Sequence, residues 1–96
     1  MPDIKYSKRA NSNLLQIKNY LLYKFTQREV DNLQKLLTDF EKVIVEFPFL
    51  YPENIFNKKI RRAVLSKQLS VFYKYSNDAI LIVTVIDNRM DYNKWP

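Results

Sequence analysis

The feature that most constrains the fold is a change in the spacing of apolar residues halfway along the chain. In the first half they recur at steps of three and four, the spacing of one helix face, at Val30, Leu33, Leu37, Phe40, Ile44 and Phe47. Pro48 ends this pattern. From Lys59 onward the period changes to two, which is typical of β-strands. The chain therefore combines a long helix with strands that follow it.

A second helix is predicted before the long one by apolar residues at Leu14, Ile17, Leu21 and Phe25. Its N-terminal cap would be Asn11, Ser12 or Asn13, whose side-chain oxygens can accept from unpaired backbone N–H groups. Thr26 and Glu29 have the spacing of a capping box and predict the start of the long helix. Helices joined by so few residues form an antiparallel hairpin, which we expect to cover a sheet.

Strands are predicted at Ile4–Ser7, Lys59–Leu65, Leu69–Tyr75 and Ala79–Asp87. Asn77 and Asp78 can adopt positive φ in the last turn, where this glycine-free chain has no glycine to use. The short turns make the last three strands an antiparallel meander. Because Ile80 to Ile86 is apolar on both faces, we place that strand inside the sheet.

The sequence thus predicts a single α+β domain over residues 1–96. The element order is β-α-α-β-β-β, with an N-terminal strand and an antiparallel helical hairpin packed on an antiparallel sheet.

Three absent residue types exclude most enzyme classes. The chain has no cysteine, no histidine and no glycine. It therefore has no disulfide or thiolate site, no imidazole base, and no glycine-rich phosphate loop. We expect no metal and no cofactor. Because no signal peptide is visible and the longest apolar stretch has eight residues, we expect a cytoplasmic protein without a membrane span.

The positive charge is concentrated in the second half. Residues 1–57 hold eight Lys and Arg against seven acids, whereas residues 58–96 hold eight against three, a balance of +5. This asymmetry favours an anionic partner, either nucleic acid or an acidic protein. The alternative interpretation is a basic surface that only keeps the protein in solution.

Several segments, taken in order, resemble the RelE/ParE superfamily of toxins over about residues 4–92. They are Tyr6-Ser7, Ala10, Leu14, Ile17, Tyr20-Leu21, Phe47-Pro48, Ile60-Arg61-Arg62, Val71-Phe72-Tyr73 and Val85-Ile86-Asp87-Asn88-Arg89. The resemblance implies a cytoplasmic poison that a co-expressed, acidic antitoxin neutralises. In this superfamily RelE-like members cleave messenger RNA on the ribosome and ParE-like members inhibit DNA gyrase, so the fold does not choose between the targets.

The RelE-like reading implies a metal-free endoribonuclease whose catalytic residues are Arg61, Arg89 and Tyr92. However, the RelE-like pattern places an arginine three residues before the tyrosine of the middle strand, here Tyr73, and this chain has Ser70 there. Loss of that cation would remove stabilisation of the charged transition state. ParE-like inhibition requires only that the protein binds its target, and we favour this interpretation. A degenerate, non-toxic nucleic-acid-binding domain is a further alternative.

The residues predicted to contact a target or an antitoxin are Lys59, Arg61, Arg62, Tyr73, Arg89 and Trp95. Each also has a structural interpretation. Neighbours on a strand point to opposite faces, so at most one of Arg61 and Arg62 shares a surface with Arg89.

Arg89 could simply pair with Asp87 or Asp91, and Tyr73 could be a core aromatic. Tyr92 and Trp95 could only cover the end of the sheet.

Overall fold

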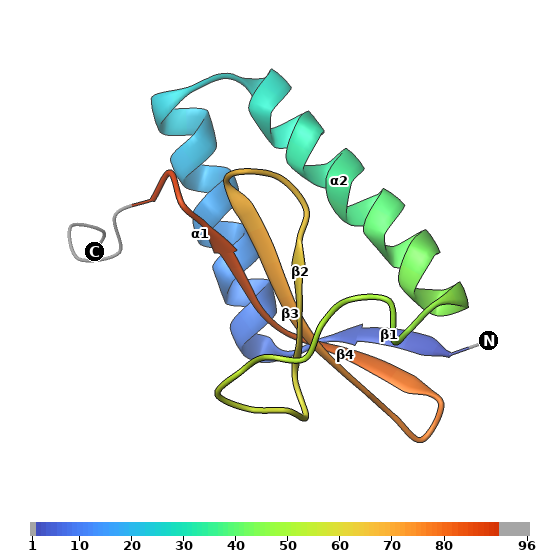
Figure 1. Ribbon diagram of the computed structural model, residues 1–96. Coiled ribbons are helices and arrows are strands. Elements are labelled where there is room, and N and C mark those ends of the chain that lie inside the picture. Colours follow the sequence, from blue (N-terminus) through green and yellow to red (C-terminus); the bar gives the residue numbers. More distant parts are fainter. Residues whose placement is uncertain (1, 91–96) are drawn as a thin grey trace.

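The computed structural model describes residues 2–90 and has the predicted α+β order. Figure 1 shows two helices on one side of a small sheet. The elements are β1 (Asp3–Tyr6), α1 (Lys8–Lys24), α2 (Gln27–Glu46), β2 (Arg61–Val64), β3 (Leu69–Ser76) and β4 (Ala79–Asp87).

The sheet has the strand order β1-β4-β3-β2. β2, β3 and β4 form the predicted antiparallel meander, and β4 lies inside the sheet as its two apolar faces indicated. β1 differs from the expectation of a wholly antiparallel sheet, because it runs parallel to β4, with Ile4 opposite Ile80. A parallel pair needs a long crossover connection, and here residues 7–78, which separate β1 from β4, provide it. The sheet is therefore mixed.

The helical hairpin packs against one face of this sheet. α1 lies on β4, and α2 lies against α1 and β1. The face of α2 predicted from its spacing is buried at Leu33, Leu37, Phe40 and Ile44. Burial of each such side chain contributes about 1.5–3 kcal/mol, so this stripe accounts for much of the attachment of α2. Phe47, the last member of the stripe, caps the helix and is 59% exposed.

α1 begins earlier than predicted. Its N-cap is Ser7, whose Oγ accepts from the backbone N–H of Ala10 at 3.0 Å. The same hydroxyl donates to the carbonyl of Val83 on β4 at 2.8 Å. Asn13, one of the predicted caps, lies inside the helix, where its side chain accepts from the N–H of Val85. Ala10 therefore lies in the first turn of α1, where it is buried.

α2 begins where predicted, with Thr26 as its N-cap, but the side-chain bond of a capping box is not formed. Glu29 instead directs its carboxylate toward Arg89. The loop between α2 and β2 is also longer than predicted, because Lys59 precedes β2 rather than belonging to it. The Asn57 side chain accepts from the N–H of Lys59 and holds a turn at that point.

The turn between β3 and β4 has the predicted geometry. Asn77 and Asp78 have φ values of 52° and 57°, the left-handed region that these two residues tolerate. A register shift between Phe72 and Tyr73 leaves Val83 as an extra residue in β4. No helix in residues 2–90 is long and apolar enough to cross a membrane.

The observed cap gives a direct test of the helix boundary. Ser7→Ala should lower the free energy of unfolding by about 1–2 kcal/mol, because the first turn of α1 loses its acceptor. Ser12→Ala, at an exposed position within the same helix, is the matched control and should change it by less than about 0.5 kcal/mol. Urea unfolding of both variants measures the difference. An equal loss of unfolding free energy in the two variants would contradict Ser7 as the cap of α1.

Candidate functional site

The structure separates the predicted site residues into three places. Lys59, Arg61 and Tyr73 lie near the start of β2, Arg62 faces the opposite side of the sheet, and Arg89 follows β4 at the other end. Tyr92 and Trp95 lie outside the described residues. The proposed catalytic pair of Arg61 and Arg89 is therefore not brought together.

Arg61 belongs to a group of cations and aromatic rings that we call the cationic end. Its members line a shallow cavity of about 310 Å³ and are Phe49, Lys58, Lys59, Arg61, Lys74 and Tyr75. The guanidinium of Arg61 lies 4.9 Å from the centre of the Phe49 ring. Its Nη1 donates to the carbonyl of Tyr51 at 2.8 Å. These contacts fix one cation beside three lysines on a surface that suits an anion.

Tyr73 supports the cationic end from within the core. Its ring is fully buried and packs edge-on against Phe40 at 5.6 Å, and its hydroxyl donates to the carbonyl of Pro48 at 2.8 Å. Burial raises the pKa of the Tyr73 phenol, although the cation of Arg61 acts in the opposite direction. This side chain ties β3 to the loop after α2 and presents no surface to a partner.

Arg61 and Arg62 face opposite sides of β2, as the alternation of a strand predicts. Ala63, which lies two residues after Arg61 and therefore on the same face of β2, is buried under the helices. Arg62 lies on the outer face, 5.9 Å from the centre of the Phe72 ring. Only Arg61 therefore reaches the cationic end.

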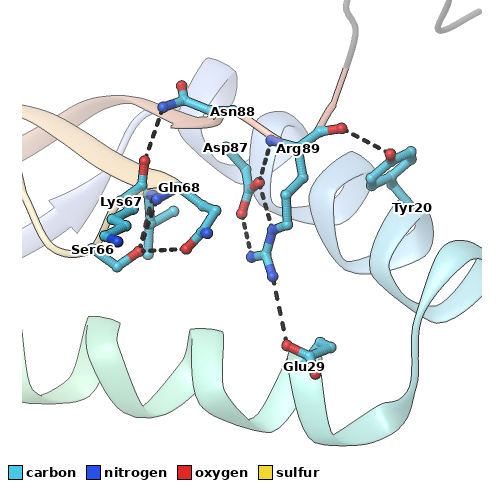
Figure 2. Close-up of polar contacts among 9 residues, drawn as sticks. Tyr20, Glu29, Ser66, Lys67, Gln68, Asp87, Asn88 and Arg89 are labelled. Atoms are coloured by element: carbon cyan, nitrogen blue, oxygen red, sulfur yellow. Dashed lines mark hydrogen bonds and ion pairs between the residues drawn. The ribbon is translucent and has the colours of Figure 1, made fainter.

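Arg89 forms a clamp with a buried acid (Figure 2). Asp87 is fully buried, and its Oδ1 accepts from both the backbone N–H and Nε of Arg89 at 2.9 Å. Its Oδ2 accepts from Nη2 at 2.6 Å. Arg89 therefore pairs with Asp87, one of the two partners that the structural interpretation offered; the other, Asp91, lies outside the described residues. The hydrogen bonds to Asp87 raise the pKa of the Arg89 guanidinium above its ordinary value.

The clamp connects the end of β4 to both helices. Nη1 of Arg89 lies 3.6 Å from the carboxylate of Glu29, and the Arg89 carbonyl accepts from the hydroxyl of Tyr20 at 2.8 Å. The guanidinium also lies 5.8 Å from the centre of the Phe25 ring. Figure 2 shows Asn88 beside it, bonded to the carbonyl of Lys67 in the turn after β2. Most of the donors of Arg89 are thus engaged within the protein.

Sequence reasoning missed Lys58, Lys74, Phe49 and Tyr75 at the cationic end. The period-two alternation could have placed Lys74 on the strand that contributes to this end. No local pattern, however, predicts the course of the loop that brings Phe49 and Lys58 beside Lys74. It also missed that Glu29 faces Arg89, because the capping-box pattern had paired Glu29 with Thr26.

The clamp predicts a specific pattern of stability. Arg89→Met should cost about 3 kcal/mol or more of unfolding free energy, because it leaves the Asp87 carboxylate buried without its cation. The double variant Asp87→Asn with Arg89→Met should recover most of that loss, since no charge is then buried. Arg62→Met, at an exposed arginine, is the control and should change stability by less than about 0.5 kcal/mol. Additive losses in the double variant would contradict the clamp.

Comparison with known proteins gives matches in structure but not in sequence. No protein-family model matches the chain, and no curated protein is similar enough to count as a relative. Among solved structures, the chromosomal ParDE toxin–antitoxin system of P. aeruginosa has a TM-score of 0.75 at 12% identity, over 91% of this chain and 96% of that one.

A copper-bound mutant toxin from Helicobacter pylori has a TM-score of 0.65 at 13% identity, over 93% and 97% of the two chains. The E. coli DinJ-YafQ complex matches with a TM-score of 0.53 at 16% identity, over 93% and 96%. Likeness at such low identity establishes a shared fold.

Proposed function

Because the chain has the RelE/ParE toxin fold that its sequence resembles, we propose that it is the toxin of a type II toxin–antitoxin system. In this proposal the protein acts in the cytoplasm by binding its target in the ParE-like manner. The target is DNA gyrase, and a cognate acidic antitoxin neutralises the protein.

One observation carries the proposal. The whole described domain, rather than a fragment, superposes on a ParDE system with a TM-score of 0.75, and more than nine-tenths of each chain is covered. The YafQ structure matches over a similar length with a TM-score of 0.53. The architecture therefore favours ParE-like action, although a fold by itself does not determine a target.

The contacts of Arg89 also support inhibition by binding. A metal-free ribonuclease needs cations that are free to stabilise a charged transition state. In this chain the Arg89 guanidinium already neutralises Asp87 and faces Glu29. Arg61 lies at the opposite end of the sheet, so the two arginines cannot act on one phosphate. Binding to a protein target requires no such convergence.

The second candidate function, a RelE-like endoribonuclease, draws its support from the cationic end. Lys58, Lys59, Arg61 and Lys74 surround one cavity, and such a group attracts a phosphate backbone. The same group attracts acidic protein surfaces and speeds encounter with them. The charge there is thus compatible with both targets and with an acidic antitoxin.

Three assays in parallel test the proposal. Purified protein should block DNA supercoiling by gyrase, induction of the gene should arrest growth, and transcripts on translating ribosomes should stay intact. Cleaved transcripts with unaffected gyrase would support the RelE-like candidate instead. Unaffected growth in the absence of any neighbouring gene would contradict both.

A pair of double variants tests the role of the cationic end. Lys58→Ala with Lys59→Ala should weaken inhibition by about tenfold, because two cations beside the cavity are lost. Lys35→Ala with Lys42→Ala removes the same charge from exposed positions of α2 and should leave inhibition unchanged. Equal effects would show that only net charge matters. Circular dichroism of both variants checks that the fold is kept.

A further inference from the structure

The loop between α2 and β2 ends in a turn that we call the tip, residues 54–60. An antiparallel bridge between Glu53 and Arg61 joins the two arms of the loop just before the tip. Beside it, the N–H of Asn54 donates to the carbonyl of Ile60 at 2.7 Å. The arms therefore form a short hairpin, and Figure 1 shows its tip in yellow-green, projecting to one side of the sheet.

Two asparagines hold the backbone of the tip. The side chain of Asn54 accepts from the N–H of Phe56 at 2.8 Å, and the side chain of Asn57 accepts from the N–H of Lys59 at 3.0 Å. The N–H of Ile60 donates to the carbonyl of Asn57 at 3.0 Å. Such local bonds let a turn keep its conformation without help from the core. The apolar side chains of the tip are thus not needed to hold it in place.

Two large apolar side chains project from the tip into water. Ile55 is 85% exposed and Phe56 is 92% exposed, the highest values for large apolar side chains within residues 2–90. Because so little of either side chain touches the protein, the pair adds almost nothing to the core. Adjacent apolar side chains that a fold leaves this open indicate a contact surface.

Cations follow the apolar pair directly. Lys58 and Lys59 are exposed on the same tip and line the cationic end together with Arg61. Phe49, which is 63% exposed, lines that cavity too, so apolar and cationic side chains adjoin there as well. Glu53 belongs to an arm of the loop, and the tip itself holds two lysines and no acid. The tip therefore combines exposed apolar surface with local positive charge.

An anionic lipid surface satisfies both properties of the tip. Acyl chains accept apolar side chains, and anionic headgroups attract lysines at the surface. A nucleic acid would attract the lysines but has no apolar phase for Ile55. A second copy would place its own lysines against these, which is unfavourable. A folded acidic protein would need pockets matched to two projecting side chains, whereas lipid adapts to their shape.

We propose that the tip docks the protein on the surface of an anionic phospholipid bilayer. Ile55 and Phe56 insert among the lipid chains, and Lys58 and Lys59 lie against the phosphate groups. Two inserted side chains beside a small cationic patch give weak, reversible binding rather than permanent anchoring. This inference goes beyond the proposed function and does not depend on it, because the supercoiling assay contains no lipid.

Sedimentation of the full chain with vesicles tests the docking. The protein should bind vesicles made of equal parts phosphatidylcholine and phosphatidylserine, and should bind phosphatidylcholine alone much more weakly. Added salt should weaken binding to the mixed vesicles, because it screens the lysines from the headgroups. Equal binding to the two kinds of vesicle, or no binding to either, would overturn the proposal.

A pair of double variants tests the role of the apolar side chains. Ile55→Ser with Phe56→Ser should weaken binding to the mixed vesicles by about tenfold or more, because the apolar surface that leaves water is lost. Leu15→Ser with Tyr23→Ser removes two exposed apolar side chains from α1 and should leave vesicle binding unchanged. Circular dichroism checks that both variants keep the fold. Unchanged binding by the tip variant would exclude insertion.

A fluorescent label reports insertion directly. Because the chain has no cysteine, Phe56→Cys allows an environment-sensitive dye to be attached at the tip alone. Its emission should rise and move to shorter wavelength on mixed vesicles, whereas the same dye attached through Tyr23→Cys should not respond. A tip dye that responds to soluble polyglutamate but not to vesicles would assign the tip to an acidic protein and overturn the proposal. A tip dye that responds to neither would overturn it as well.

Discussion

The buried carboxylate of Asp87 imposes the strongest constraint on the arrangement of this protein. A charge without exposed surface at the end of β4 requires a cation within hydrogen-bond distance, and Arg89 supplies it through its backbone and its guanidinium. Because Arg89 also faces Glu29 and bonds Tyr20 through its carbonyl, the same contact attaches the helical hairpin to the sheet. One ion pair thus closes one end of the domain.

At the opposite end of the sheet, the cationic end holds four basic side chains, Lys58, Lys59, Arg61 and Lys74. There the loop after α2 is held by Tyr73 and Arg61, which bond the carbonyls of Pro48 and Tyr51. Among residues 2–90 Asp87 is the only buried acid, so the lysines around Arg61 have none beside them to neutralise. The two arginines that the family resemblance put into one catalytic site therefore have different surroundings: Arg89 pairs with a buried acid, and Arg61 lies beside a cavity among lysines.

Much of the fold could be predicted because its elements have local signals. The stripe on α2, the stop at Pro48 and the Asn77-Asp78 turn each depend on neighbouring residues. The errors arose where distant contacts decided the outcome. Ser7 caps α1 because its hydroxyl also reaches Val83, β1 runs parallel to β4 across the whole chain, and Glu29 faces Arg89 sixty residues away. No window of sequence contains both partners, and for the same reason the cationic end was only partly foreseen.

β2 is an edge strand of the sheet, and an open strand edge normally favours self-association. The loop before β2 covers the beginning of this edge, since the N–H of Arg62 donates to the carbonyl of Pro52 and the N–H of Asn54 donates to the carbonyl of Ile60. Antiparallel pairing of two copies along β2 would also bring two Arg62 side chains to one edge, and like charges brought together in this way oppose pairing. The covering loop and the charge of β2 therefore both act against pairing of this edge with a second copy.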